Sequence, residues 1–220
     1  MNIVDNFLPN RYKKELVEII ASHNFPWFYH DSMSYRGNDE VKKPSIVDKN
    51  IKETSQFVHF FMLDTGEFYC SDYWERLKPM FWLFADKTNI DYKKIVRCKA
   101  NLILKGKDFK MGQYNFPHTD INEDNGKEYI TALYYLIDSD GPTYVFDENL
   151  RDNLDKDIWT RSCNPLSNKD YSPLPKSVHI KDKSEVTENR LVYFDAYQYH
   201  ASSNPINHSR RIVINLLMEL

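Results

Sequence analysis

The stretch Arg211-Ile212-Val213-Ile214-Asn215-Leu216 is a clear strand, because β-branched residues dominate it and turn-forming residues precede it. Side chains alternate along a strand, so Arg211 and Asn215 are predicted to share one face with Val213. Similar β-rich segments lie at residues 95–104, 129–137, 143–146 and 190–195. No helical pattern of ten or more residues separates them, which favours antiparallel pairing over parallel βαβ units.

The first part of the chain shows a different periodicity. Apolar residues in 10–20 have the spacing of an amphipathic helix, directly after Pro9. A second helix is predicted over residues 71–87, with Pro79 as a kink or as its true first turn. The short aromatic run at 56–61 indicates a strand, and residues 31–52 are polar and typical of a loop.

Two helices followed by many strands predict an α+β protein, in which N-terminal helices brace an antiparallel jelly roll. The 220 residues fit a single domain. Within it we expect a helical elaboration at residues 1–94 and a jelly-roll core at residues 95–220. Residues 147–189 have no clear period, and a segment of that length is typical of a functional loop such as a substrate lid.

Composition narrows the class of protein. The chain is 41% hydrophobic and 15% aromatic, which excludes a wholly disordered or collagen-like chain. The formal charge of −3 gives no basic surplus for nucleic acid. No apolar run is long enough to span a membrane, no signal peptide is visible, and the three cysteines lack paired spacing. We therefore expect a cytoplasmic protein with no membrane or nucleic-acid partner.

The motif Pro117-His118-Thr119-Asp120 is the sharpest chemical signal. Residues i and i+2 of a strand point to the same side, so His118 and Asp120 are placed to hold one ion. His200, which follows another predicted strand, is the candidate for the third ligand. Two imidazoles and one carboxylate leave three coordination positions open, as in non-haem Fe(II) oxygenases. The alternative is a surface histidine that caps a turn, because the bare motif is weakly specific.

Arg211 adds a second signal. A guanidinium at the start of a buried strand is costly without an anionic partner, and a carboxylate ligand would supply one in bidentate geometry. A solvated arginine at the strand start is the alternative interpretation. Arg210 is expected on the opposite, outward face.

Taken together, these motifs resemble the Fe(II)- and 2-oxoglutarate-dependent oxygenases, especially the prolyl 4-hydroxylase-like branch. The matching segments, in the family's order, are Arg97–Leu102, Pro117–Asp120, Ile130–Leu136, Asn189–Asp195, His200 and Arg211–Asn215. The resemblance implies a double-stranded β-helix with iron held by His118, Asp120 and His200. It also implies that Arg211 pairs with the distal carboxylate of 2-oxoglutarate. The interval between His200 and Arg211 is one residue longer than in some relatives, which keeps Arg210 as an alternative.

The resemblance extends to the walls of the pocket. Thr131, Leu133 and Tyr135 share one strand face, and the matching face of the prolyl hydroxylases lines the cosubstrate pocket. Tyr135 is the candidate for a phenol that binds the distal carboxylate, and a packed core aromatic is the alternative. Asn101 and Asn215 are candidates for contacts to 2-oxoglutarate or to an iron-bound water. Either amide is equally suited to satisfying backbone groups near a strand end.

The activity implied is a dioxygenase that uses Fe(II), 2-oxoglutarate and O₂ to hydroxylate a C–H bond, with release of succinate and CO₂. The branch implies a peptidyl proline on a protein or peptide partner as substrate. A free amino acid or another small molecule is the alternative substrate. A different class of protein, a non-oxidative metal-binding jelly roll, would explain the three ligands but would give Arg211 no task.

Overall fold

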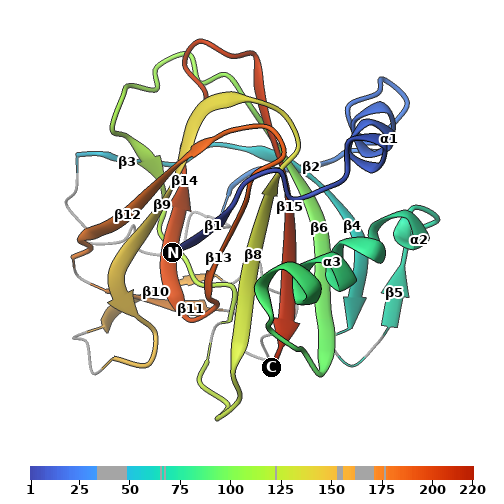
Figure 1. Ribbon diagram of the computed structural model, residues 1–220. Coiled ribbons are helices and arrows are strands. Elements are labelled where there is room, and N and C mark those ends of the chain that lie inside the picture. Colours follow the sequence, from blue (N-terminus) through green and yellow to red (C-terminus); the bar gives the residue numbers. More distant parts are fainter. Residues whose placement is uncertain are drawn as a thin grey trace.

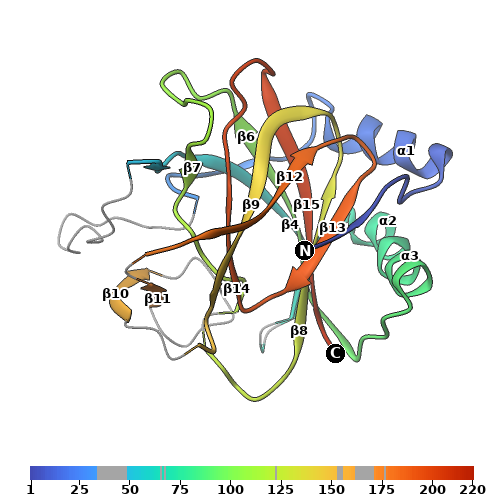
Figure 2. The ribbon, with the colours of Figure 1, turned by 60° about the vertical axis from the view of Figure 1, so that its left-hand side comes forward.

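The computed structural model describes residues 1–33, 49–64, 66, 68–121, 123–152, 156–161, 171–175 and 177–220. Figures 1 and 2 show two sheets that face each other, with the helices on the outer side of the larger sheet. This layered arrangement leaves an interior between the sheets, and the candidate functional residues lie there.

The larger sheet has eight strands. Seven of them lie in the order β1 (Asn2–Val4), β13 (Leu191–Asp195), β8 (Tyr129–Tyr135), β15 (Arg210–Glu219), β6 (Lys94–Leu104), β4 (Gln56–Asp64) and β2 (Phe28–His30), and β5 (Phe68–Cys70) pairs with β4. The facing sheet consists of β12 (Ile180–Val186), β9 (Ser139–Asn149) and β14 (Gln198–Ser202). All pairings within these two sheets are antiparallel among the described residues, which confirms the predicted antiparallel architecture.

Two small sheets complete the strand pairing that the structure describes. One is the antiparallel pair of β10 (Lys156–Arg161) and β11 (Tyr171–Pro175). The other is the parallel pair of β3 (Ile51–Lys52) and β7 (Tyr114–Asn115). The segment 147–189, predicted as a loop with a possible lid function, thus holds the end of β9 and the strands β10, β11 and β12. Its residues 153–155, 162–170 and 176 lie outside the described residues.

Residues before position 95 contribute strands as well as helices to the domain. β4 pairs with β6 along much of its length, and β1 pairs with β13 at the other edge of the large sheet. Of these strands the sequence indicated only residues 56–61, because strands of three residues are too short to show a period. The large sheet is therefore completed by the N-terminal part of the chain.

The helices form where the sequence predicts them. α1 spans Asn10–Ile20, and the second predicted helix consists of α2 (Trp74–Leu77) and α3 (Pro79–Thr88), with Pro79 in the first turn of α3. Proline fits there because a first-turn residue needs no intrahelical N–H bond. Leu16 of α1 and Phe81 of α3 belong to one buried cluster with Ile214 of the large sheet. No helix among the described residues is both long and apolar enough to cross a membrane.

The strand alternation predicted from the sequence decides which side chains enter the interior. Ile214 and Tyr134 belong to the cluster beneath the helices. Val213 and Tyr135 belong to the cluster between the two sheets, together with Val145 of β9. The inner face of β15 and β8 is therefore the face that also carries Arg211 and Asn215.

Candidate metal centre

His118 and His200 are joined by their backbones. The His118 N–H donates to the His200 carbonyl at 3.0 Å, and the His200 N–H donates to the His118 carbonyl at 2.9 Å. This antiparallel pair places both imidazoles on the same side, with ring centroids 4.5 Å apart. The Asp120 N–H donates to the Ala196 carbonyl at 3.1 Å, which fixes the other end of the motif beside the loop that precedes β14.

The three side chains converge as a metal site requires. One ligand atom from each of His118, Asp120 and His200 lies within 4.8 Å of the others, and Oδ2 of Asp120 is 3.9 Å from Nε2 of His200. Two atoms bound to one ion at about 2.1 Å can be at most about 4.2 Å apart. Small side-chain adjustments would therefore bring all three onto a single ion.

Hydrogen bonds hold each imidazole in the form that binds metal. Nδ1 of His118 lies 3.3 Å from the Phe116 carbonyl, and Nδ1 of His200 lies 3.1 Å from the Gln198 carbonyl. A carbonyl oxygen only accepts, so Nδ1 carries the proton and Nε2 keeps its lone pair. Burial lowers the pKa of both imidazoles below the ordinary value, which keeps them neutral at neutral pH.

Asp120 is a buried carboxylate that accepts hydrogen bonds from several side chains. Arg97 forms a buried ion pair with Oδ1. Thr131 donates to Oδ2 at 2.6 Å, and Asn215 donates to Oδ2 at 3.1 Å. Burial is the largest influence and would raise the pKa of Asp120, but the nearby charges, of which Arg97 is the strongest, together outweigh it and hold the pKa well below the ordinary value. Asp120 is therefore ionised, as a metal ligand must be.

The metal triad opens onto a small cavity of about 50 Å³. Its lining is mainly polar and comes from both sheets: Met33, Gln56, Lys99, Asn101, His118, Leu133, Thr143, His200, Ala201, Ser202, Arg211, Val213 and Asn215. Two of these side chains, Lys99 and Arg211, are cations, and no carboxylate is found among the described lining residues. The cavity thus suits a ligand with negative charge.

Arg211 lies in this cavity without an anionic partner among the described residues. The side chain is buried, and its Nη2 donates to the Thr143 hydroxyl at 2.7 Å. Tyr135 donates from its phenol to the same hydroxyl at 2.9 Å. Nε of Arg211 has no hydrogen-bond partner, and burial lowers the pKa of Arg211 to about 10. A buried cation bonded only to a neutral hydroxyl indicates a site for an anion.

The structure brings the sequence-predicted site residues together around this cavity. His118, His200, Arg211, Asn101, Leu133 and Asn215 line it. Asp120 and Tyr135 contact lining residues, whereas the Thr131 hydroxyl is directed at Asp120. Asn101 donates to Oε1 of Gln56 at 2.6 Å. Arg211 is the arginine that lines the cavity, and Arg210 is partly exposed at the start of β15.

Sequence reasoning gave no role to Arg97, Thr143 or Lys99. Alternation along 97–102 places Arg97 and Lys99 on the face of Asn101, which is a usable signal. Thr143 had no such signal, because its contact with Arg211 depends on how two sheets face each other. Long-range contacts of this kind are set by the fold and not by local pattern.

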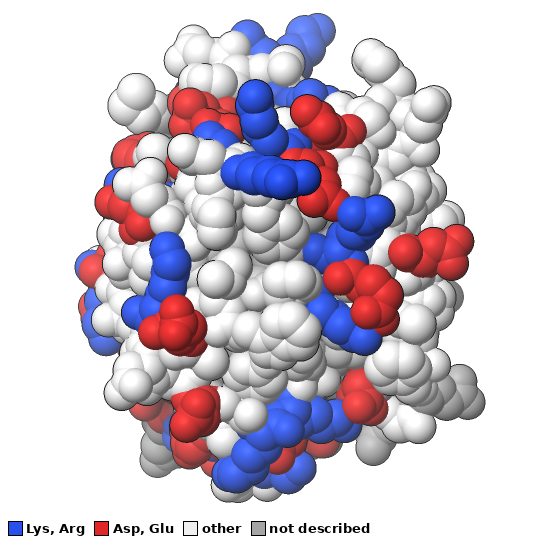
Figure 3. Space-filling view, turned by 45° about the vertical axis from the view of Figure 1, so that its right-hand side comes forward, with Lys and Arg blue, Asp and Glu red and all other residues white. Residues whose placement is uncertain are grey.

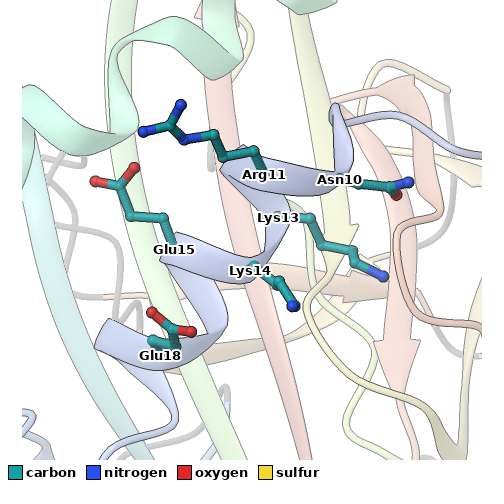
Figure 4. Close-up of a pocket in the computed structure, with 6 residues that line it drawn as sticks. All are labelled: Asn10, Arg11, Lys13, Lys14, Glu15 and Glu18. Atoms are coloured by element: carbon teal, nitrogen blue, oxygen red, sulfur yellow. The ribbon is translucent and has the colours of Figure 1, made fainter.

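A second hollow follows the outer face of α1, where Arg11, Lys13, Lys14, Glu15 and Glu18 project (Figure 4). Glu15 forms an ion pair with Arg76, and Lys13 lies 3.1 Å from Glu188. Figure 3 shows acidic and basic side chains interspersed over the face that it presents. These are features of a solvated surface.

Comparison with solved structures shows that this fold is similar to the folds of a prolyl hydroxylase, an epimerase and a carbocyclase. A prolyl hydroxylase from Trichoplax adhaerens, in complex with a hypoxia inducible factor peptide fragment, aligns with a TM-score of 0.51 and 14% identity over 99% of this chain and 82% of that chain. The epimerase SnoN, in complex with Fe³⁺, alpha ketoglutarate and nogalamycin RO, aligns with a TM-score of 0.55 and 12% identity over 98% of this chain and 77% of that chain.

The non-heme alpha ketoglutarate-dependent carbocyclase SnoK, from nogalamycin biosynthesis, aligns with a TM-score of 0.55 and 12% identity over 99% of this chain and 78% of that chain. No protein-family model matches the chain, and no curated protein matches its sequence. The resemblance noted from the sequence motifs is thus confirmed at the level of the fold.

Proposed function

We propose that this protein is an Fe(II)- and 2-oxoglutarate-dependent dioxygenase that hydroxylates a C–H bond. The observation that carries the proposal is the presence, in one cavity, of a facial set of metal ligands and a buried arginine with no anion bound to it among the described residues. Fe(II) with 2-oxoglutarate and O₂ would supply the oxidising chemistry, with succinate and CO₂ released.

The ligand set fits iron. His118, Asp120 and His200 would hold the metal through two neutral imidazoles and one carboxylate. These ligands would occupy one side of the ion and would leave three positions for cosubstrate and O₂. The backbone bonds between His118 and His200 fix the two imidazoles before the metal arrives.

The far wall of the cavity fits the distal carboxylate of 2-oxoglutarate. Arg211 supplies the charge, and the hydroxyls of Tyr135 and Thr143 converge beside it. The Tyr135 phenol can turn from Thr143 to the carboxylate, and Thr143 can donate in its place. Lys99 is a second cation in the same cavity, which suits a ligand with a carboxylate at each end.

The cavity must enlarge before it can hold 2-oxoglutarate. An open space of about 50 Å³ accommodates roughly four water molecules, which is less than 2-oxoglutarate needs. Met33, Gln56 and Lys99 are unbranched, flexible side chains in the lining. We expect their movement to admit the cosubstrate, while the buried strand residues Arg211 and Asn215 stay in place.

For the substrate we propose a peptidyl proline, with the whole chain acting as one oxygenase domain. The sequence motifs of the prolyl hydroxylase-like branch support this choice, as does the similarity in fold to a prolyl hydroxylase that binds a peptide. The TM-score is somewhat higher for SnoN, solved with nogalamycin RO, and for SnoK from nogalamycin biosynthesis, which supports a small-molecule substrate as the second candidate. A non-oxidative metal protein would leave Arg211 without a function.

An anaerobic titration with Fe(II) and 2-oxoglutarate tests the reaction class. We expect a weak metal-to-ligand charge-transfer band in the visible range, which disappears in His118→Ala and weakens in Arg211→Met. Arg210→Met is the matched control, because it removes a neighbouring arginine that does not line the cavity. A folded, iron-loaded protein with no such band would refute the proposal.

A further inference from the structure

We propose that Arg97 is a positioning residue of the metal centre: it holds Oδ1 of Asp120 away from the ion and so keeps Oδ2 turned toward His200, where the ion would bind. This role rests on the proposed metal site. Arg97 lies on β6, beside Leu217 of β15 in the strand register. Its side chain and that of Asp120 are each 3% exposed, so the pair is shielded from water and from competing ions.

The two carboxylate oxygens of Asp120 have different surroundings. Oδ1 is bonded by Nη2 of Arg97. Oδ2 accepts from Thr131 and Asn215, and it is the oxygen that lies 3.9 Å from Nε2 of His200. The metal-facing oxygen is therefore the one that Arg97 does not hold.

Asn215 ties this arrangement into a closed ring. Nη2 of Arg97 donates to Oδ1 of Asn215 at 3.3 Å, and Nδ2 of Asn215 donates to Oδ2 of Asp120 at 3.1 Å. Arg97, Asp120 and Asn215 come from two neighbouring strands and the motif segment, so a rotation of the carboxylate would break at least one charge-assisted bond. The ring fixes the orientation of the carboxylate plane.

A fixed orientation has a consequence for cosubstrate binding. A carboxylate that is free to rotate can place both oxygens on one ion, and the second oxygen then occupies a position that a ligand needs. By holding Oδ1, Arg97 would leave that position to one of the two oxygens through which 2-oxoglutarate would bind the ion. The structure thus assigns Arg97 an effect on the affinity for cosubstrate, although it does not line the cavity.

Cobalt substitution provides the test, because Co(II) reports ligand number through its visible absorption and does not require turnover. In Arg97→Gln we expect an altered Co(II) spectrum and an affinity of the Co(II)-loaded protein for 2-oxoglutarate about 10–100-fold weaker than in the wild type. Arg97→Lys retains the charge but not the fork geometry of the guanidinium, so we expect both properties to lie between those of Arg97→Gln and those of the wild type. Lys94→Met is the control, since Lys94 is on the same strand and pairs with Asp64 at the surface, 3.0 Å away.

Folded Arg97→Gln with a wild-type spectrum and wild-type affinity for 2-oxoglutarate would overturn this role. If Arg97→Gln does not fold, Arg97→Lys provides the test. An ammonium cannot reproduce the geometry of the guanidinium. A fully wild-type Co(II) spectrum and a fully wild-type affinity for 2-oxoglutarate in Arg97→Lys would therefore also overturn the role. Failure of the metal site itself gives a different result. In that case the Co(II) spectrum of the wild-type protein is the same as that of His118→Ala, and both proposals are refuted.

Discussion

Two buried arginines on neighbouring strands give the most informative comparison in this protein. Arg97 of β6 is 2% exposed and Arg211 of β15 is 3% exposed, and both are directed into the space between the sheets. Arg97 has a carboxylate, Asp120, and the amide of Asn215 as partners. Among the described residues, Arg211 donates to the hydroxyl of Thr143 and lies 5.9 Å from the centre of the Tyr135 ring, and it has no anionic partner.

The difference indicates that Arg97 stabilises the folded protein through an internal ion pair, whereas Arg211 is placed to bind an anionic ligand. A buried ion pair is satisfied before any ligand arrives, so Arg97 and Asp120 can be considered as one unit of the folded protein. A buried cation without an anion costs free energy until a ligand supplies one. The folding stability of the ligand-free protein should therefore change in opposite directions when Arg97 or Arg211 is replaced by a neutral residue.

The largest expected effect is a loss of activity when a residue of the candidate metal triad is replaced. His200→Ala removes one of three metal ligands, and we expect 2-oxoglutarate turnover to fall by at least about 1000-fold, because the metal contributes several kcal/mol to the reaction. The rate of succinate formation measures this turnover. His208→Ala is the control, since His208 is exposed and pairs with Asp140 outside the cavity. Equal losses in the two variants would argue against the triad.

The next effect tests the ion pair. Arg97→Met leaves the Asp120 carboxylate buried without its cation, and we expect the metal-free protein to lose about 3–5 kcal/mol of unfolding free energy. Urea denaturation measures the change. The double variant Arg97→Met with Asp120→Leu should recover most of the loss, since both charges are then gone. A loss below about 1 kcal/mol in the single variant would show that the pair is not a unit of the fold.

Arg211→Met should have the opposite effect on stability. Removing a buried charge that has no anionic partner is expected to leave the ligand-free protein unchanged or stabilised by about 1 kcal/mol. The same change should raise the KM for 2-oxoglutarate by about 10–100-fold, because the carboxylate loses a hydrogen-bonded charge pair. Arg210→Met should change neither quantity. If Arg211→Met were as destabilising as Arg97→Met, Arg211 would belong to the fold as well.

Much of the fold could be predicted from the sequence, because the strands of the two facing sheets are long enough to show their period. The alternation in Arg211-Ile212-Val213-Ile214 already separates the inner face from the face beneath the helices. The helix at residues 10–20 and the first-turn position of Pro79 were also predictable from local chemistry. The strands β1 and β2 were not, because three residues at a sheet edge carry no pattern and form through pairing alone.

Some features of the candidate site could likewise be predicted from local sequence, and others depend on long-range contacts. The spacing of His118 and Asp120 and the strand position of Arg211 are local features. In the structure His118 and Arg211 line one cavity, and Asp120 lies beside it. The contacts of Thr143 and of Arg97 join strands that are distant in the sequence. The partner of a buried charge is set by the register and stacking of the sheets, and only the folded structure contains that information.

The smallest expected effect concerns the turn that leads into β15 and so toward Arg211. Asp140 accepts backbone N–H bonds from Ile206 at 3.1 Å, Asn207 at 2.7 Å and His208 at 3.2 Å. Burial opposes ionisation of this carboxyl, but these bonds outweigh it and lower the pKa of Asp140 to about 2. The folded state therefore favours the charged form.

We expect Asp140→Asn to cost about 1–2 kcal/mol at pH 7, after a discount for the 26% exposure of this side chain. The stabilisation is complete above the unfolded-state pKa near 4, falls to about half near pH 3 and is lost as the pH drops through the folded-state value. Urea midpoints of wild type and variant should therefore converge in acid. A difference that stays constant with pH would mean that shape rather than charge holds the turn. An affinity for 2-oxoglutarate close to the wild-type value would show that Arg211 is positioned by the buried strand itself, with the turn contributing stability alone.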